Sequence, residues 1–510
     1  MRKIVNSVVK SYLKYHYKRV ERIMEHPLDA QSSWLSHLIS TNKRTDFGLK
    51  YGFKDIRNYE DFAVRVPVSD YEGHKPYIER MMQGEKDVLW NGKIKFFAKS
   101  SGTTSDKSKF IPVSSQNLRK GHIRSSWDSM SIFYHQNPNS QAFKNRTILM
   151  GGSIQKHESY PQSVIGDVSA IMMHHIPLIG RPFVAPDLDI AMLPDFEAKL
   201  ERMAQMLPQE NLVLLGGVPT WTIVLIRKIL EKTGANNLLE IWPNLEGYLH
   251  GGVSFEPYRS QFSQYIPSEK FIYQEVYNAS EGFFAVQNDY STDDLLLLLD
   301  NGIFYEFLPA SEWEKEFPVA VPLEDVRIGE NYALVISTNA GLWRYLVGDT
   351  VVFTSTKPYK IKISGRTKQF INVFGEELML ANTEKAIAMT CSEMNASVED
   401  YTLAPVFFEA DKKGGHEWVI EFDFPPKDVE KFAALLDSNL RKVNSDYDAK
   451  RFKDMAMLPL KLTVVPKGTF YSWLKSKNKL GGQYKVPRLS NERTYLEEIL
   501  RVANATNSPI

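Results

Sequence analysis

The chain of 510 residues is 43% hydrophobic and 12% aromatic, which is enough apolar material for roughly three domain-sized units. Lys and Arg number 62 against 61 Asp and Glu, so the chain lacks the basic surplus with which proteins bind nucleic acid or anionic membranes generally. Cys391 is the single cysteine, which excludes an intrachain disulfide framework and a cysteine metal cluster and suits a reducing compartment.

Residues 1–26 predict an amphipathic helix, because their apolar side chains recur at helical spacing: Ile4, Val8, Val9, Tyr12 and Leu13. Charged residues interrupt every apolar run before it reaches the length of a signal peptide or a membrane span. A basic helix of this kind can lie on a membrane surface, but we expect it to pack on the protein's own body. The sequence therefore predicts a soluble, cytoplasmic protein without a membrane span.

Four later segments each predict a strand that ends at glycine or another small residue. They are "RTILMGGS" (146–153), "NLVLLGGVPTW" (211–221), "LEGYLHGGVS" (245–254) and "KFIYQEVYNASEG" (270–282). Helical patterns at 196–206 and 220–232 alternate with them, which indicates α/β layering. Ligands of such sheets bind beyond the carboxyl ends of the strands, where these turns fall.

The chain then becomes rich in strands from 295 to 363. Leu295–Leu299 is followed by "DNG" and by "IFYEFL", which predicts a buried hairpin rather than a membrane element. After "SGRTK" at 364–368 the pattern is compact α+β. We expect helices near 382–395 and 428–443, with strands at "YTLAPVFFEA", "EWVIEFDF" and "LKLTVV". These patterns predict a large domain over 1–363 and a small one over 364–510.

Phe97–Ser114, "FAKSSGTTSDKSKFIPVS", gathers small hydroxyl residues, glycine and lysines after a predicted strand. Successive backbone N–H groups of such a loop form a concavity for anions, and Gly102 lets the backbone approach a ligand closely. The P-loop pattern GxxxxGK[ST] is absent. An ordinary Ser/Thr/Gly surface loop explains these residues equally well when they are taken alone.

Other segments follow in a fixed order: "HGGVS" (250–254), "VYNASEGF" (276–283), "WRYLVGDTVVF" (343–353), "ISGRTKQFINVFGEEL" (363–378) and "GGQYKVPR" (481–488). With 100–112 they resemble the adenylate-forming superfamily, and more closely its GH3 branch of acyl acid amido synthetases. The GH3 patterns SSGTTxGxxKxIP, YxxSEG and RYxVGD are matched at 100–112, 277–282 and 344–349, except that Asp106 replaces a glycine. The sequence of residues 365–377 is more similar to the hinge motif of the wider superfamily. This hinge sequence, together with the absence of a visible targeting signal, suggests a bacterial member.

The resemblance implies a large N-terminal adenylation domain, with layered α/β sheets and a β-barrel-like part, and a small mobile α+β C-terminal domain. The hinge would lie near 364–368, with Lys368 as its pivot. The implied enzyme is a ligase that adenylates a carboxylic acid with ATP and Mg²⁺, and then transfers the acyl group to an amino acid amine, releasing AMP and pyrophosphate. The partners are thus small molecules, not nucleic acid.

The resemblance also implies roles for single residues. Phosphates would be bound by Ser100, Ser101, Gly102, Thr103 and Thr104, with Lys109 at the lysine position of the family. Glu281 would bind Mg²⁺, since a carboxylate with phosphate oxygens suits this hard ion. Ser280 would bond the α-phosphate. For Glu281 a purely structural role, as an acid in the first turn of a helix, is also compatible with the sequence.

Asp349 would accept hydrogen bonds from both ribose hydroxyls, because one carboxylate offers two acceptor oxygens. Arg366 would lie near ribose and phosphate, Tyr277 would stack on adenine, and Gly252 and Val253 would line the base. Each has a structural alternative: a turn acid for Asp349, a surface ion pair for Arg366, a core aromatic for Tyr277.

Lys485 in "GGQYKVPR" would reach the α-phosphate and the carboxylate during adenylation, since lysine is a compact charge on a long stem. Helix 118–134 would contribute to the acyl pocket. Arg124 on this helix would pair with a substrate carboxylate or, as an ordinary exposed arginine, with solvent.

Two alternatives stay open. The first is transfer of the acyl group to coenzyme A on the same fold. The second is a catalytically silent nucleotide-binding homologue, which is supported only by Asp106, because a carboxylate near phosphates repels them. The neighbours His174 and His175 belong to no HExxH or other metal-ligand spacing, and G-x-S-x-G is absent. Neither the acid nor the amine can be identified from these residues.

Overall fold

The structure is a computed structural model, and the residues that it describes are 2–100, 109–253, 255, 258–313, 315–367, 370, 371, 373, 376, 378–407, 414–451, 457–480 and 485–506. The chain forms two compact units. Unit 1 comprises residues 1–252 and 266–362, and unit 2 comprises 253–265 and 363–510. The short segment 253–265 thus belongs to unit 2 although unit 1 precedes and follows it in the chain, an arrangement that the sequence patterns did not predict.

The N-terminal helix α1 (Arg2–Glu25) packs on the protein itself, as expected. Its residues Leu13 and Val20 are fully buried and contact apolar side chains of α6 (Arg124–Gln136), among them Phe133 and Ile132. No helix in the described part of the chain is long and apolar enough to cross a membrane.

Four helices follow α1 in the chain, and three of them begin with a side-chain cap. They are α2 (Pro27–Asn42), α3 (Asp46–Lys50), α4 (Tyr59–Arg65) and α5 (Tyr71–Met82). The side chain of Asn58 accepts a hydrogen bond from the Asp61 amide, and that of Asp70 accepts one from the Glu72 amide. Such caps satisfy amides that would otherwise lack partners at the start of a helix.

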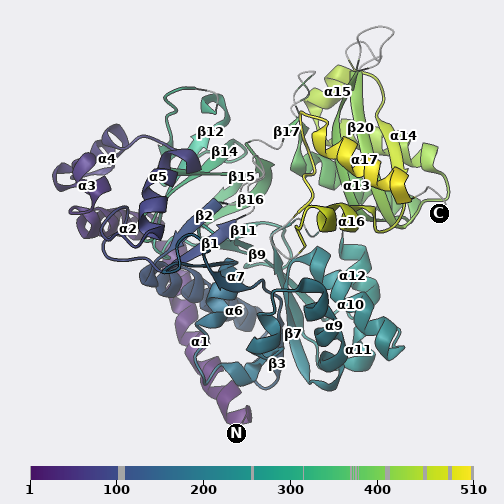
Figure 1. The fold of residues 1–510 in the computed structure, drawn as a ribbon, viewed down its shortest axis with the longest axis horizontal. Helices are drawn as coiled ribbons and strands as arrows, with labels where there is room; N and C mark the ends of the chain where they lie inside the picture. The colour runs from purple at the N-terminus through teal and green to yellow at the C-terminus, as the bar shows by residue number, and fades with distance from the viewer. Residues whose placement is uncertain are drawn as a thin grey trace. The chain divides into compact units, whose positions relative to one another are not determined.

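The four predicted glycine-ended strands are all present and lie side by side in parallel, which confirms the α/β prediction. They are β3 (Arg146–Leu149), β7 (Leu212–Gly217), β8 (Gly247–Gly251) and β9 (Ile272–Asn278), and β6 (Val184–Ala185) pairs with β3 at the edge. Helices α9 (Phe196–Met206) and α10 (Pro219–Thr233) lie beside these strands (Figure 1). The carboxyl ends of β7, β8 and β9 therefore meet at one edge.

The strand-rich region extends the same sheet. Among the described residues the order is β13-β12-β14-β15-β16-β11-β10-β9-β8-β7-β3-β6. The added strands are β10 (Phe283–Val286), β11 (Leu295–Leu297), β12 (Ile303–Pro309), β13 (Val321–Pro322), β14 (Asn331–Thr338), β15 (Tyr345–Thr356) and β16 (Tyr359–Arg366).

The predicted hairpin after Leu299 is wrong. Strand β11 pairs with β10 and β16, whereas β12 pairs with β13 and β14. The turn has the expected left-handed glycine, Gly302 with φ 88°, but the Gly302 carbonyl accepts its hydrogen bond from the amide of Asn339, in the turn after β14. Local turn chemistry predicted the glycine conformation, while the pairing was decided by strands distant in the sequence.

The strands on either side of the SSGTT motif form part of a second sheet, with the order β2-β1-β5-β4. Its strands are β1 (Phe96–Ser100), β2 (Lys109–Val113), β4 (Ile154–Lys156) and β5 (Val164–Gly166). Strand β1 pairs antiparallel with β2 and parallel with β5. Helix α7 (Val168–His174) follows β5.

Unit 2 has the predicted α+β composition. Its elements are α12 (Arg259–Tyr265), β17 (Phe370–Ile371), β18 (Leu378–Met379), α13 (Leu380–Met394), β19 (Ser397–Phe407), β20 (Gly414–Phe424), α14 (Val429–Val443), α15 (Ser445–Arg451), β21 (Lys461–Val465), α16 (Thr469–Ser476) and α17 (Thr494–Thr506). One face of the sheet β19-β20-β21 carries Trp418, Ile420 and Phe422 into a core with α13 and α14. Because side chains alternate along a strand, Glu417 and Glu421 point to the opposite face.

Candidate active site

The two ends of the SSGTT segment are held next to each other. Ser100, the last residue of β1, is the register partner of Lys109, the first residue of β2. The Lys109 ammonium lies 5.6 Å from the ring centre of Tyr71, whose hydroxyl accepts a hydrogen bond from the Phe110 amide. Ser101, Gly102, Thr103, Thr104 and Asp106 lie outside the described residues. The strand pairing thus places the predicted lysine opposite the first serine of the motif.

Tyr277 and Asp349 are in direct contact. Tyr277 lies near the end of β9 and Asp349 within β15, and the tyrosine hydroxyl donates a hydrogen bond of 2.7 Å to Oδ2 of the carboxylate. The Tyr277 ring is buried and packs edge-on against Phe284, with ring centres 4.8 Å apart. The hydrogen bond joins the YxxSEG and RYxVGD segments at one point, although 72 positions separate the two residues in the chain.

Ser280 and Glu281 lie in the tight turn between β9 and β10. Ala279 and Gly282 exchange backbone hydrogen bonds across it, of 2.8 and 3.3 Å, so the two residues between them are held in a fixed loop. Glu281 is 7% exposed. Among the described residues no three His, Cys, Asp or Glu side chains form a metal-binding group. A hard cation at Glu281 would therefore need further oxygen ligands from phosphate and water, which is the usual environment of Mg²⁺.

His122 supports the YxxSEG turn from the side, and sequence reasoning missed it. It belongs to a π-helical turn, Asn117–Ile123, which precedes α6, and its Nδ1 lies 3.2 Å from Oδ1 of Asn278. Burial lowers the pKa of His122 to about 4, so the ring is neutral at physiological pH. π-Helical turns often occur at functional sites. This backbone feature points to His122, whereas no sequence motif does.

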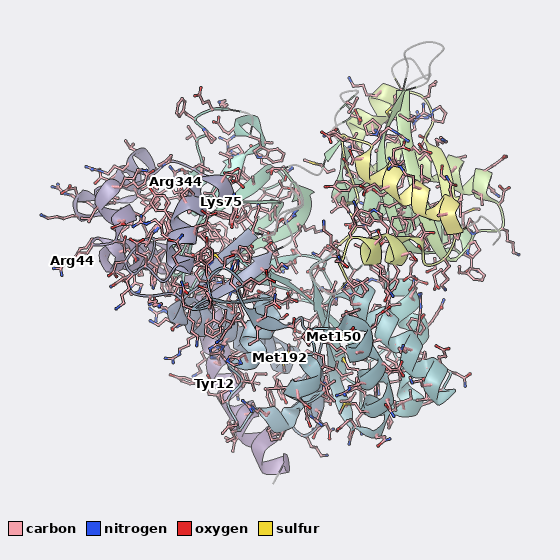
Figure 2. The ribbon with its side chains drawn as sticks, viewed as in Figure 1. Tyr12, Arg44, Lys75, Met150, Met192 and Arg344 are labelled. Atoms are coloured by element: carbon pink, nitrogen blue, oxygen red, sulfur yellow. The ribbon has the colours of Figure 1, made fainter. Side chains whose placement is uncertain are left out.

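The arginine of the RYxVGD motif has a structural role. Arg344 has a positive φ of 41°, and its guanidinium pairs with the fully buried carboxylate of Glu306 at 2.8 Å and donates to the carbonyls of Ala63 and Val66, both at 2.7 Å. Figure 2 shows Arg344 among the side chains of the part of unit 1 formed by the N-terminal helices and β12 to β15. This anchor fixes the start of β15 and hence the position of Asp349, five residues later.

A single buried cluster connects the three motif segments of unit 1. It contains Phe97, which precedes Ser100, then Tyr277, and also Val347, which precedes Asp349. A hydrogen bond of 2.5 Å from Ser114 to the Asn339 carbonyl further joins the end of the first motif to the turn before β15. The structure therefore places the strands on either side of the first motif, the YxxSEG turn and the RYxVGD strand on one apolar core.

The remaining predicted residues lie in other parts of the chain. Gly252, with φ 86°, ends the first stretch of unit 1 after β8, and Val253 begins the segment 253–265, which is assigned to unit 2. Arg366 is the last residue of β16, within unit 2. Lys485 also belongs to unit 2, and its side chain is exposed. Lys368 lies outside the described residues.

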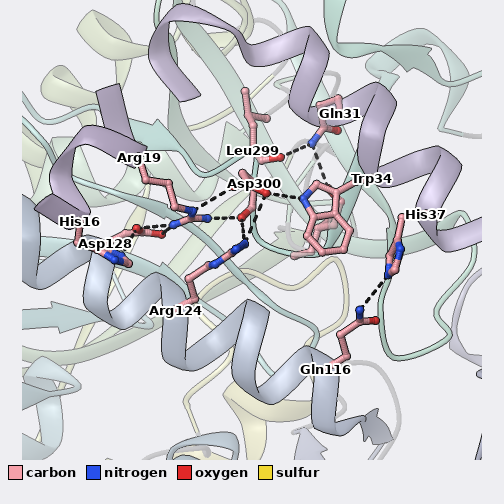
Figure 3. Close-up of polar contacts among 11 residues, drawn as sticks. His16, Arg19, Gln31, Trp34, His37, Gln116, Arg124, Asp128, Leu299 and Asp300 are labelled. Atoms are coloured by element: carbon pink, nitrogen blue, oxygen red, sulfur yellow. Dashed lines mark hydrogen bonds and ion pairs between the residues drawn. The ribbon is translucent and has the colours of Figure 1, made fainter. Parts of the chain in front are cut away.

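Arg124 is committed to a partner within the protein. Its guanidinium donates to the Asp300 carbonyl at 2.9 Å and lies 3.5 Å from the Asp300 carboxylate, so the prediction of an exposed arginine is wrong (Figure 3). Arg19 binds the same carboxylate at 3.0 Å and reaches the buried Asp128 at 2.5 Å, while Trp34 donates to Asp300 at 2.8 Å. These contacts join α1, α2 and α6 to the turn after β11.

Asp167 was also missed. It follows β5, whose residue Gly166 is the register partner of Ala98 in β1, so its backbone lies at the same sheet edge as Ser100. Burial raises the pKa of Asp167 to about 7, and the lysines 199 and 99 oppose this rise. The Asp167 carboxylate lies against Gly152, and it fits there only because glycine has no side chain. A Cβ on residue 152 would lie 1.5 Å from Oδ2 of Asp167.

Comparison with known proteins gives this arrangement a family. Models of the N-terminal, central and C-terminal domains of the GH3 family match residues 16–271, 296–366 and 381–494. The chain belongs to the GH3 family. The three matched regions include Lys109, Asp349 and Lys485, so the GH3 resemblance predicted from the motifs is confirmed.

Individual GH3 proteins, and solved structures with the same fold, are similar to this chain over most of their length. The indole-3-acetic acid-amido synthetase GH3.3 of Arabidopsis thaliana is 24% identical, with 90% of this chain and 88% of that protein aligned. The structure of the GH3.15 acyl acid amido synthetase superposes with a TM-score of 0.78 at 19% identity and 96% coverage of both chains. A 2-hydroxyisobutyryl-CoA ligase with a bound acyl-AMP superposes with a TM-score of 0.58 at 12% identity, covering 93% of this chain and 91% of that one. This GH3 protein therefore has the adenylate-forming fold.

Proposed function

We propose that this GH3 protein is an ATP-dependent acyl acid amido synthetase. It activates a carboxylic acid as an acyl-adenylate, with release of pyrophosphate, and then transfers the acyl group to the amine of an amino acid, with release of AMP. The relatives named as amido synthetases support this assignment, as does the acyl-AMP bound by the structural neighbour.

The observation that carries the proposal is the contact between Tyr277 and Asp349. It brings two motifs that are distant in sequence to one place, next to the fixed turn of Glu281. A carboxylate offers two acceptor oxygens, which suits the two hydroxyls of a ribose. Tyr277 would thus act through its hydroxyl on Asp349, and stacking of its ring on adenine remains part of the proposal.

Each predicted residue has a physical task in the first step. The backbone and hydroxyls of Ser100, Ser101, Gly102, Thr103 and Thr104 would bind the phosphates, and Ser280 would bond the α-phosphate. Two anions, a carboxylate and ATP, must approach each other, so positive charge has to be placed where negative charge develops. Lys109, Arg366 and Lys485 would supply that charge, and Lys368 would act as the pivot that presents Lys485.

A magnesium ion would be held by Glu281 together with phosphate oxygens. The turn offers a carboxylate and the Ser280 hydroxyl, both hard oxygen ligands, which fits this ion. When bound, it would neutralise phosphate charge. The protein's own contribution would be the hydrogen-bonded turn, which holds the Glu281 carboxylate in place for the ion.

The test is exchange of labelled pyrophosphate into ATP, with Mg²⁺ and a panel of carboxylic acids that includes indole-3-acetate, benzoate and short aliphatic acids. Exchange should appear with the right acid and vanish without any acid. A folded protein that shows no exchange with the whole panel would contradict the proposal.

Adding a mixture of amino acids and, separately, coenzyme A to the active acid then distinguishes two products. An amide with AMP is expected. A thioester instead would favour the acyl-CoA ligase alternative. The structural similarity to 2-hydroxyisobutyryl-CoA ligase is the reason to test for it. Nucleotide binding without turnover would indicate the silent homologue.

A further inference from the structure

The exposed Lys485 begins a short extended segment that is tightly bound to the sheet of unit 2. The Leu403 amide donates to the carbonyl of Arg488 at 2.8 Å, the Ser490 amide donates to the carbonyl of Leu403 at 3.2 Å, and Thr402 donates to the carbonyl of Pro487 at 2.6 Å. The segment from 485 to 490 therefore runs alongside β19 and forms a parallel bridge with it.

Arg488, three residues after Lys485, joins this segment to its surroundings through its side chain. Its guanidinium pairs with the Asp400 carboxylate at 2.7 Å and lies 4.3 Å from the ring centre of Tyr401. Its Nη2 donates a hydrogen bond of 2.6 Å to the hydroxyl of Tyr258. The Arg488 and Asp400 side chains are 12% and 15% exposed, so this ion pair is largely removed from water. Burial raises the pKa of Asp400 to about 6, and Arg488 opposes that rise.

Tyr258 belongs to the segment 253–265, which unit 1 precedes and follows in the chain. A second contact holds this segment to β19: the Gln261 side chain donates to the Ser397 hydroxyl at 2.6 Å and to the Val398 carbonyl at 3.2 Å. Tyr258 is five residues after Val253, which is expected to line the base of the nucleotide. One guanidinium thus lies between the segment of Lys485 and the segment that leads to the base-binding turn.

We infer that Arg488 is a positioning residue for adenylation, which orients Lys485 through its contacts with Asp400, Tyr401 and Tyr258. This inference rests on the proposed function. A flexible lysine on a loop loses entropy whenever it must meet the α-phosphate, whereas one that begins an anchored segment has lost that freedom already. Arginine suits the role because its planar fork binds a carboxylate and a hydroxyl at once and also lies over an aromatic ring, which a lysine in its place cannot do.

The matched control is Arg493, five residues further along. It pairs with Glu417 at 2.7 Å and with Glu497 at 2.6 Å, on the same face of the sheet, and contacts neither Tyr258 nor Asp400 in the described structure. Arg493→Lys changes the same residue type in the same C-terminal region without touching the proposed anchor.

The experiment measures the two half-reactions separately on the full chain, with the variants Arg488→Lys, Tyr258→Phe and Arg493→Lys. Acyl-adenylate formation is followed in a single turnover with labelled ATP and the acid that supports exchange. Aminolysis is followed with prepared indole-3-acetyl-adenylate or benzoyl-adenylate and an amino acid mixture. Arg488→Lys should slow adenylation by about 10- to 100-fold, because small misplacements of a reacting group have effects of this size. Tyr258→Phe removes one hydrogen bond to a charged group and should slow it by up to about tenfold.

In Arg488→Lys and Tyr258→Phe, the ATP affinity and the aminolysis rate should remain at wild-type values. Arg493→Lys should match the wild type in the adenylation rate as well. Hydrogen exchange of the 485–492 region, measured by mass spectrometry, should become faster in Arg488→Lys and Tyr258→Phe but not in Arg493→Lys. Adenylation at the wild-type rate in Arg488→Lys, or an equal loss of both half-reactions, would overturn the inference alone. Absence of adenylation in the wild type with every acid would overturn the proposed function, and this inference with it. If Arg488→Lys does not fold, Tyr258→Phe still decides, because it deletes only a hydroxyl.

Discussion

The two units hold their predicted site residues by different means. In unit 1 the motif residues lie on one apolar cluster, reinforced by the buried Arg344–Glu306 pair and by a neutral, buried His122. In unit 2 the segment of Lys485 is attached to the sheet by backbone hydrogen bonds and by the ion pair of Arg488 with Asp400, which is largely removed from water, while Arg493 pairs with Glu417 at a partly exposed position. Unit 1 thus relies on apolar packing, whereas unit 2 relies on polar contacts, of which only the exposed ones can be exchanged at small cost. The proposed roles, a nucleotide site in unit 1 and a lysine in unit 2, follow this difference.

The largest effect should come from removing the anchor of unit 1. Arg344→Met leaves Glu306 buried without its cation, and breaking a buried pair in this way costs about 3–5 kcal/mol of unfolding free energy. Urea denaturation measures this loss. The double variant Arg344→Met/Glu306→Gln should recover part of it, because no buried charge remains. A loss below about 1 kcal/mol would show that the pair does not support unit 1.

The pH dependence of unit 1 should follow His122. Above the ordinary histidine pKa neither the folded nor the unfolded state holds the proton. As the pH falls from there to the folded value of about 4, only the unfolded state binds it, so stability decreases. Between about pH 7 and about pH 4 this residue should account for a loss of about 3 kcal/mol.

His122→Gln removes this contribution, so its unfolding free energy should fall less on acidification than that of the wild type. The control is His135→Gln, at an exposed position of α6, which should fall as much as the wild type. Equal acid sensitivity of the wild type and His122→Gln in urea titrations would mean that the imidazole is not held neutral by burial.

The smallest effect is expected at the charged face of unit 2. Arg493→Gln removes one partner of Glu417, but Lys461 at 2.8 Å and the hydroxyl of Thr463 at 2.9 Å remain. Because Arg493 is partly exposed, the loss in unfolding free energy should be about 1 kcal/mol or less. A loss as large as that of Arg344→Met would remove the contrast between the two units.

Much of the fold could be predicted from the sequence, because strands that end in glycine and helices with apolar periodicity are local signals. The helix predicted at 196–206 is α9, and the strands predicted before Gly151, Gly216, Gly251 and Asn278 are β3, β7, β8 and β9. The pairing of β11 with β16 was not predictable, because it depends on residues more than 60 positions away that compete with the local turn.

The candidate site divides in the same way. Motif residues such as Asp349 and Glu281 were found through their fixed spacing, but the supporting contacts were not. His122 with Asn278, and Arg488 with Tyr258, are pairs of ordinary residues far apart in the chain. Only the folded chain makes them neighbours, and no local pattern marks them. The assignment of 253–265 to unit 2 was missed for the same reason.

The most direct test of the account compares ATP binding and acyl-adenylate formation in Asp349→Ala and Lys485→Ala. Asp349→Ala should weaken ATP binding by about 10- to 100-fold, because it removes the charged acceptor of two hydrogen bonds. Lys485→Ala should leave ATP affinity within about twofold of the wild type and slow adenylate formation by at least about 100-fold, since its charge acts only as the transition state forms. Equal loss of binding and of adenylation in both variants would contradict a division of labour between the two units.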